Sequence, residues 1–112
     1  MEQKIKVKKK SARQVVKDVQ MLLTSYKYAS RVLLEDDTHI INRPRKEVSR
    51  SVYIARHIEN VIESLNDRDR FILRNEFVLG KSGKWYIGYY SDSTYYRNRI
   101  KAYRAFLLEL EK

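Results

Sequence analysis

Apolar residues that recur every three or four positions constrain this chain more than any other feature. This spacing places side chains on one face of an α-helix, and the alternation typical of strands is missing from the sequence. We therefore expect an all-α fold of about five helices. Four run from residue 11 to near 35–44, from about 44 to 65, along 66–79 and along 93–110, and a short one lies in the "WYIGYY" stretch at residues 85–90. The predicted apolar faces are Val15, Val16, Val19, Leu22, Leu23, Tyr26, Ala29 and Leu33, then Val48, Val52, Ala55, Ile58, Ile62 and Leu65, then Phe71, Ile72, Leu73, Phe77 and Val78, and finally Tyr95, Ala102, Tyr103, Phe106, Leu107 and Leu110.

Residues that favour helix ends separate these stretches. Polar residues and a proline between the first and second predicted helices indicate a short loop. These two helices should therefore form an antiparallel pair. A flexible loop should follow the third helix, through the glycines in "GKSGKW". The predicted N-caps are Ser11 for the first helix, Asn66 or Asp67 for the third, and Asp92 or Ser93 for the last. Pro44 is expected in the first turn of the second helix, and Gly80 should end the third.

The length of 112 residues suits one small domain. Within it we distinguish a disordered basic arm at residues 1–10, which holds five lysines, a helical pair at 11–65 and a helix-turn-helix module at 66–112. The helical pair is the candidate surface for a homodimer.

The net charge of +10, from 24 Lys and Arg against 14 Asp and Glu, favours a polyanionic partner such as DNA, RNA or an anionic membrane. Simple solubility is the alternative explanation. The polar faces of the expected helices mix acids with bases, so helix pairing explains them better than a membrane surface does. Neither a membrane-spanning stretch nor a signal peptide is evident, so we expect a cytoplasmic, nucleoid-associated protein without membrane partners.

Enzymatic chemistry is not indicated. Cysteine is absent, His39 and His57 lie far apart, and the acids at residues 35–37 are explained by a helix end. No Ser, His and acid set appears, and "GKSGKW" lacks the spacing of a phosphate-binding loop. We expect no enzyme activity, no cofactor and no metal.

The stretch "YYSDSTYYRNRIKAY" at residues 89–103 is the strongest functional signal. Arg97, Arg99, Lys101 and Arg104 follow one another with no acid among them, after a polar turn. A short helix, a tight turn and a longer basic helix make a helix-turn-helix, whose second helix enters the major groove of DNA. A solvated basic face is the alternative explanation. We expected Tyr96, Arg97 and Ile100 to share the face that points away from the core.

The segments "SLNDRDRFILRNEFV" and "YSDSTYYRNRIKAYRAFLLEL" resemble region four of bacterial sigma factors. The "STYYR" form is similar to phage late-gene activators of the ArpU and RinA type and, with "KWY" before it, to small sigma-like proteins of mycoplasmas and spiroplasmas. "WYIGYYS" is slightly shorter than the corresponding helix of that family. The resemblance implies contact with bases or the groove by Asp92, Ser93, Tyr96, Arg97 and Ile100, and with the DNA backbone by Thr94, Arg99, Lys101 and Arg104.

The leading hypothesis is a sequence-specific, sigma-like transcription regulator that binds double-stranded DNA with a recognition helix at residues 93–110. An RNA-binding helical protein is one alternative, because basic and aromatic side chains also suit unpaired bases. A protein-interaction adaptor, whose basic surface only keeps it soluble, is the other.

Overall fold

The structure is a computed structural model that describes residues 9–39 and 45–112, with side chains described outside residues 33–48. It contains α2 (Ala12–His39), α3 (Arg45–Glu63), α4 (Asp67–Leu73), a π-helical turn η2 (Arg74–Val78) that continues α4, and α5 (Asp92–Leu110). No strand occurs in these ranges, so the predicted all-α class is confirmed.

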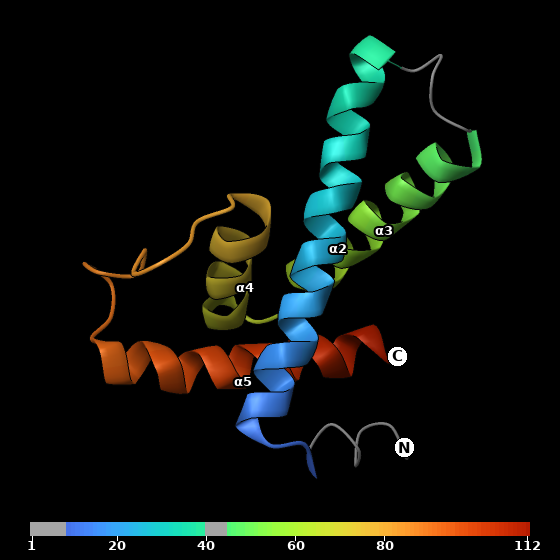
Figure 1. Cartoon of the computed structure of the whole chain (residues 1–112). Coiled ribbons are helices and arrows are strands. Elements are labelled where there is room, and N and C mark those ends of the chain that lie inside the picture. The colour runs from blue at the N-terminus through green and yellow to red at the C-terminus, as the bar shows by residue number, and fades with distance from the viewer. Residues whose placement is uncertain (1–8, 40–44) are drawn as a thin grey trace.

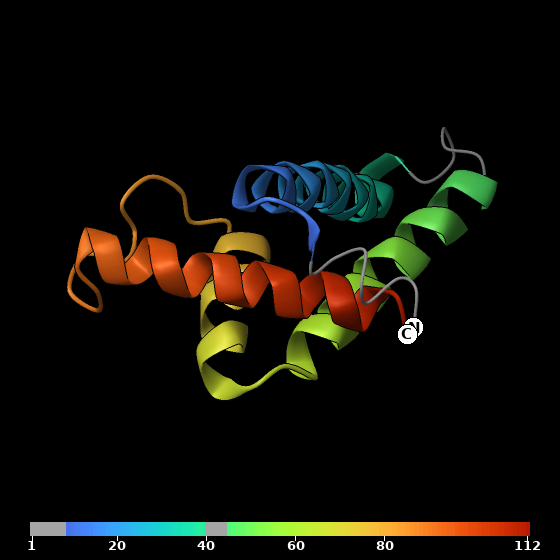
Figure 2. The same ribbon diagram turned by 90° about the horizontal axis from the view of Figure 1, so that it is seen from below.

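Two long helices cross above a third. α2 rises through the centre of the molecule, α3 returns beside it at an angle, and α5 runs along the bottom of the view in Figure 1. Seen from below, α5 lies nearest to the viewer, so its underside is not covered by another described helix (Figure 2). The expected antiparallel pair is therefore present, and α5 closes the molecule from below.

One hydrophobic cluster joins all these helices. It includes Val15 and Val19 of α2, Ile62 of α3, Leu73 of α4 and Phe106 of α5, each fully or almost fully buried. The core therefore runs across the expected boundary at residues 65/66. Burial of this apolar surface is the main force that holds α5 in place.

The predicted apolar faces are largely confirmed, including Tyr95 and Phe106 as core residues. Val78 is the exception, because 42% of its surface is exposed at the end of η2. Leu33 and Val48 lie outside the described side chains, as do His39 and the acids at residues 35–37.

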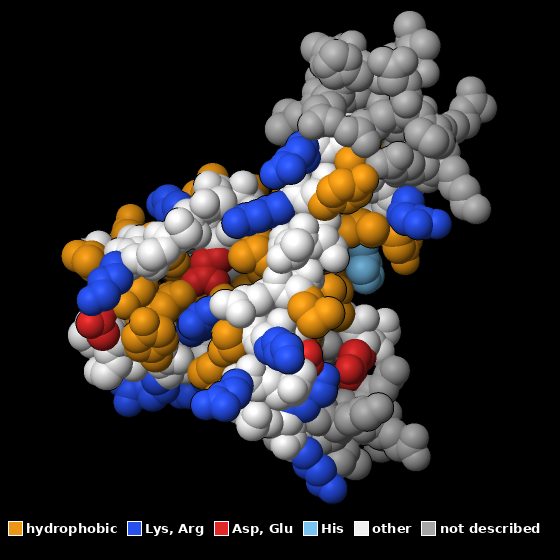
Figure 3. Space-filling view, viewed as in Figure 1, with side chains coloured by type: hydrophobic (Ala, Val, Ile, Leu, Met, Phe, Trp, Pro, Cys, Tyr) orange, Lys and Arg blue, Asp and Glu red, His pale blue; other side chains and the backbone are white. Residues whose placement is uncertain are grey.

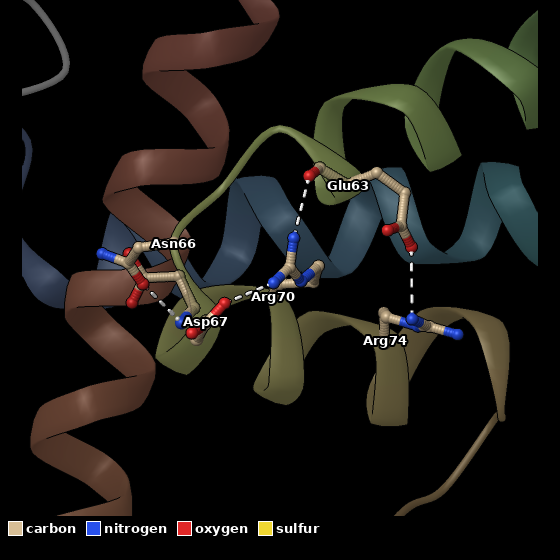
Figure 4. A network of polar contacts seen from close by, with 6 residues as sticks. Glu63, Asn66, Asp67, Arg70 and Arg74 are labelled. Carbon is tan, nitrogen blue, oxygen red and sulfur yellow. Dashed lines mark hydrogen bonds and ion pairs between the residues drawn. The ribbon is translucent and has the colours of Figure 1, made fainter.

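Polar contacts fix the turn between α3 and α4 (Figure 4). Asn66 caps α4, its side chain accepting the backbone N–H of Asp69 at 2.9 Å, which confirms one of the two predicted caps. Arg70 pairs with Asp67 and donates to the carbonyl of Glu63 at 3.3 Å. The turn therefore sets the direction in which α4 leaves α3.

The backbone widens into a π-helix directly after α4. The N–H of Leu79 bonds to the carbonyl of Arg74 at 2.9 Å, one residue beyond the α-helical partner. The side-chain amide of Asn75 donates to the carbonyl of Phe71 at 2.7 Å. Three consecutive residues, Asn75, Glu76 and Phe77, are buried in this wider turn. A polar side chain and a carboxylate thus enter the interior.

The short helix expected at residues 85–90 is not formed. Trp85–Tyr89 is a hydrogen-bonded turn, with bonds from Ile87 N to the Lys84 carbonyl and from Tyr89 N to the Tyr86 carbonyl. Gly88 adopts a φ of 102°, a left-handed conformation that does not continue a helix. The described chain therefore has four α-helices rather than about five, and a segment of loops and turns at residues 79–91 precedes α5.

Serine side chains cap the N-termini of α2 and α5. The hydroxyl of Ser11 accepts the N–H of Gln14 at 3.1 Å, as predicted. At α5 the cap is Ser91, whose hydroxyl accepts the N–H of Thr94 at 3.3 Å. The prediction of Asp92 or Ser93 as this cap was wrong, because both residues already belong to the first turn of α5.

Candidate nucleic-acid interface

The underside of α5 carries a run of basic side chains. Arg97 and Lys101 are exposed and lie four positions apart, so they share one face, and the partly buried Arg104 follows three positions later. The acidic residues of α5 lie at its ends, at Asp92 and Glu109. The middle of this face, which we call the basic face of α5 (Ser93, Arg97, Lys101 and Arg104), therefore carries positive charge alone.

The first turns of α2 extend this positive surface. Arg13 and Lys17 are exposed there, and both line a hollow shared with Ile100 of α5. Figure 3 shows basic side chains along the lower edge of the molecule, over α5 and the start of α2. Lys10 is not part of this free charge, because it pairs with Asp18 at 2.7 Å. The hydrogen bond from Lys10 is the main cause that lowers the pKa of the Asp18 carboxyl.

Asp92 holds the preceding segment. Its carboxylate accepts the Tyr86 hydroxyl at 2.7 Å and pairs with Lys84 at 3.4 Å. The bond from Tyr86 is the largest contribution that lowers the pKa of Asp92. The side chain therefore remains ionised and ties residues 84–86 to the start of α5. This role differs from the base contact that the resemblance implies.

The expected site residues divide between two surfaces. Ser93, Arg97 and Lys101 are exposed on the basic face, and the hydroxyl of Thr94 accepts a bond from that of Ser91 at 2.9 Å. A second group turns toward α2 and lines the hollows there: Tyr96, Arg99 and Ile100. Tyr96 and Ile100 line the hollow beside α2, whereas Arg97 is not among its lining residues.

Arg99 is held inside the protein rather than extended toward solvent. It is partly buried, and its guanidinium lies 5.0 Å from the centroid of the Tyr103 ring. A cation over an aromatic face is stabilised by the charge distribution of the ring. Arg99 therefore belongs to the α2-facing group, and its expected contact with the DNA backbone stays a prediction.

A buried carboxylate surrounded by aromatic rings lies behind this surface. Glu76 is 6% exposed and accepts bonds from the hydroxyls of Tyr95 and Tyr103 and from the indole N–H of Trp85, the last at 3.1 Å. Tyr95 also stacks on Tyr86, with centroids 3.8 Å apart and planes 7° from parallel. We call Glu76 with these three donors the Glu76 cluster. It fastens η2 and residues 85–86 to α5.

Sequence reasoning missed this cluster. The available signal was an acidic residue on an apolar stripe, since Glu76 follows Ile72 by four positions and Leu73 by three. Burial is the largest cause that raises the pKa values of Tyr95 and Tyr103, and the negative charge of Glu76 adds to it. Both hydroxyls therefore stay protonated and can donate to Glu76.

A metal site or a membrane-spanning helix would require particular groupings of residues. Among residues 9–32 and 49–112, where side chains are described, no three His, Cys, Asp or Glu residues gather as metal ligands would. No helix in the described ranges has the length and apolar composition to span a bilayer.

No protein family, curated protein or solved structure matches the chain, so a functional proposal has to rest on its own geometry.

Proposed function

We propose that the chain binds double-stranded DNA through the basic face of α5 and acts as a transcription regulator. One observation carries the proposal: Arg97 and Lys101 are exposed one turn apart on α5, the partly buried Arg104 follows three positions later, and no acid lies between them along the helix. Duplex DNA carries a dense row of phosphates, and its major groove admits an α-helix.

The position of each side chain suggests its role. Arg97 lies in the second turn of α5, in the part of a recognition helix that reaches base edges. A guanidinium there can donate two bonds to guanine O6 and N7. Lys101 and Arg104 lie one and two turns further on, where they suit phosphates. Arg13 and Lys17, exposed beside Ile100 of α5, would extend the same charge toward flanking DNA.

The approach to DNA would differ from that of a standard helix-turn-helix. Residues 79–91 replace a tight turn, and the helical element packed on α5 is α4 rather than a short helix at 85–90. The buried aromatics Tyr95 and Tyr103 fix the orientation of α5 in place of that short helix. The resemblance to sigma region four supports a role in transcription, and contact of residues 11–65 with RNA polymerase or a second copy remains a prediction.

Selection of bound sequences from a random duplex pool, followed by single-base changes, tests the proposal. Arg97→Ala should relax the preference at one base pair by about 1 to 3 kcal/mol. Lys101→Ala should weaken all duplexes alike and lower the slope of log affinity against log salt by about 1. Arg56→Ala, at an exposed position on α3, is the matched control and should change neither quantity. Equal weakening of every duplex by Arg97→Ala would contradict base reading.

A further inference from the structure

A groove between α2 and α5 forms a second surface, which adjoins the basic face of α5 at Arg13 and Lys17. It consists of a hollow of about 360 Å³ near the start of α2 and one of about 210 Å³ beside residues 81–86. Gln20, Tyr96 and Arg99 line both hollows, so the two lie next to each other. Figure 3 shows the hollowed surface between α2 and the segment 79–91, with basic side chains around an acidic centre.

The charge along this groove is positive. Arg13 and Lys17 line the first hollow, Lys27 and Lys81 line the second, and Arg99 belongs to both. Glu76 is the one acid among the lining residues, and its oxygens already accept the bonds of the Glu76 cluster. An anionic ligand therefore meets five cations along the groove, whereas the oxygens of the single carboxylate are occupied by internal donors.

The groove also contains an aromatic ring that is open to a ligand. Tyr96 is 51% exposed, although its ring is fixed by tilted contacts with Tyr95 at 5.3 Å and Tyr86 at 6.3 Å. A ring that is already ordered loses little conformational entropy when it binds. Trp85, the one tryptophan of the chain, lines the same hollow.

We propose that this groove binds single-stranded nucleic acid, with phosphates against the cations and an unpaired base stacked on Tyr96. Proteins that bind single strands combine a positive groove with aromatic platforms in this way. Hollows of a few hundred Å³ accommodate one or two nucleotides but not a duplex, whose place would be the open basic face of α5. The proposal does not depend on duplex binding by α5.

Trp85 provides the measurement, because its indole lines the groove and bonds to Glu76. The full chain is titrated with oligo(dT), oligo(U) and a duplex of equal length, each labelled for anisotropy, while the intrinsic tryptophan fluorescence is followed. Single strands should change the fluorescence of Trp85 as they saturate the protein. Binding of either oligonucleotide together with a change in Trp85 fluorescence supports the proposal, and the tighter of the two identifies the preferred sugar.

Variants separate the two surfaces. Tyr96→Ala should weaken single-strand binding about tenfold or more and leave duplex binding within twofold. Arg97→Ala should give the opposite pattern, and Tyr53→Ala, an exposed tyrosine on α3, should affect neither. If Tyr96→Ala is unstable, Tyr96→Phe keeps the ring and should retain binding, whereas Lys17→Gln with Lys27→Gln should reduce the salt dependence.

Three results would overturn the proposal. Single-strand affinity unchanged in Tyr96→Ala would remove the stacking platform. Saturation by anisotropy without a change in Trp85 fluorescence would place the strand elsewhere. Equal weakening of duplex and single strand by Tyr96→Ala would mean that the groove and the basic face are one site. Loss of duplex binding alone, in Arg97→Ala, concerns the proposed function and not this groove.

Discussion

Replacing Glu76 by alanine tests the internal support of both proposed surfaces. The change removes the shared acceptor of two tyrosine hydroxyls and one indole N–H. A hydrogen bond to a charged group contributes about 1.5 to 3 kcal/mol, so three of them set an upper limit of about 4.5 to 9 kcal/mol.

Two effects reduce that limit. Burying a carboxylate is itself unfavourable, and its removal recovers part of that free energy. The adjoining hollow of about 210 Å³ also lets water reach the donors that Glu76 leaves behind. We therefore expect Glu76→Ala to lower the free energy of unfolding by about 3 to 5 kcal/mol, a large share of the total for a small domain.

Urea unfolding followed by helical circular dichroism and by Trp85 fluorescence measures this loss. Glu76→Gln keeps an acceptor oxygen and should cost clearly less than Glu76→Ala. The matched control is Glu63→Ala, which removes an exposed carboxylate 3.5 Å from Arg74 and should change stability by at most about 1 kcal/mol. If Glu76→Ala proved as mild as Glu63→Ala, the Glu76 cluster would not hold η2 against α5.

The remaining predictions concern α5, the turn before it and alkaline pH. Ser91→Ala should cost about 1 kcal/mol in thermal unfolding, whereas Ser93→Ala should cost almost nothing; the reverse order would refute the cap. Gly88→Ala should lower stability by about 1 to 2 kcal/mol through backbone strain alone, since no atom lies within 4 Å of the added methyl; an unchanged melting curve would refute this. Burial is the largest cause that raises the pKa of Tyr26 to about 12, and the hydrogen bond to Glu59 adds to it; the pKa of Tyr95 is raised as well. The free energy of unfolding should therefore stay constant below about pH 10, the pKa of an unfolded tyrosine, and fall as the pH rises toward 12. Tyrosinate absorbance and circular dichroism should change together.

The helices were predictable because their signal is local. Spacing of three and four positions identifies an amphipathic face whatever it packs against, and the cap residues Ser11 and Asn66 act on their own helices. The turn at residues 85–89 was not predictable in this way. Tyr86 is buried by stacking on Tyr95, so tertiary contacts rather than helix propensity decide its backbone.

The site was predictable in composition but not in orientation. The sequence indicates that Arg97, Lys101 and Arg104 are surplus charge, and the structure places them on or near the surface. The sequence alone does not show that α2 crosses α5 beside Tyr96 and Ile100, because that crossing joins residues far apart in the chain. The Glu76 cluster is hidden for the same reason, since its donors lie 9, 19 and 27 positions away.

The location of α5 at the end of the described chain affects how the protein is made. Tyr103, Phe106 and Leu107 complete a core that otherwise comes from residues 15–77, so those earlier helices leave the ribosome with their apolar faces unmatched. The native core therefore cannot close until residues 103–107 of α5 have been synthesised. A chain that stops before residue 103 keeps Arg97 and Lys101 but lacks the buried side chains that hold α5 in place, so its basic residues have no fixed surface.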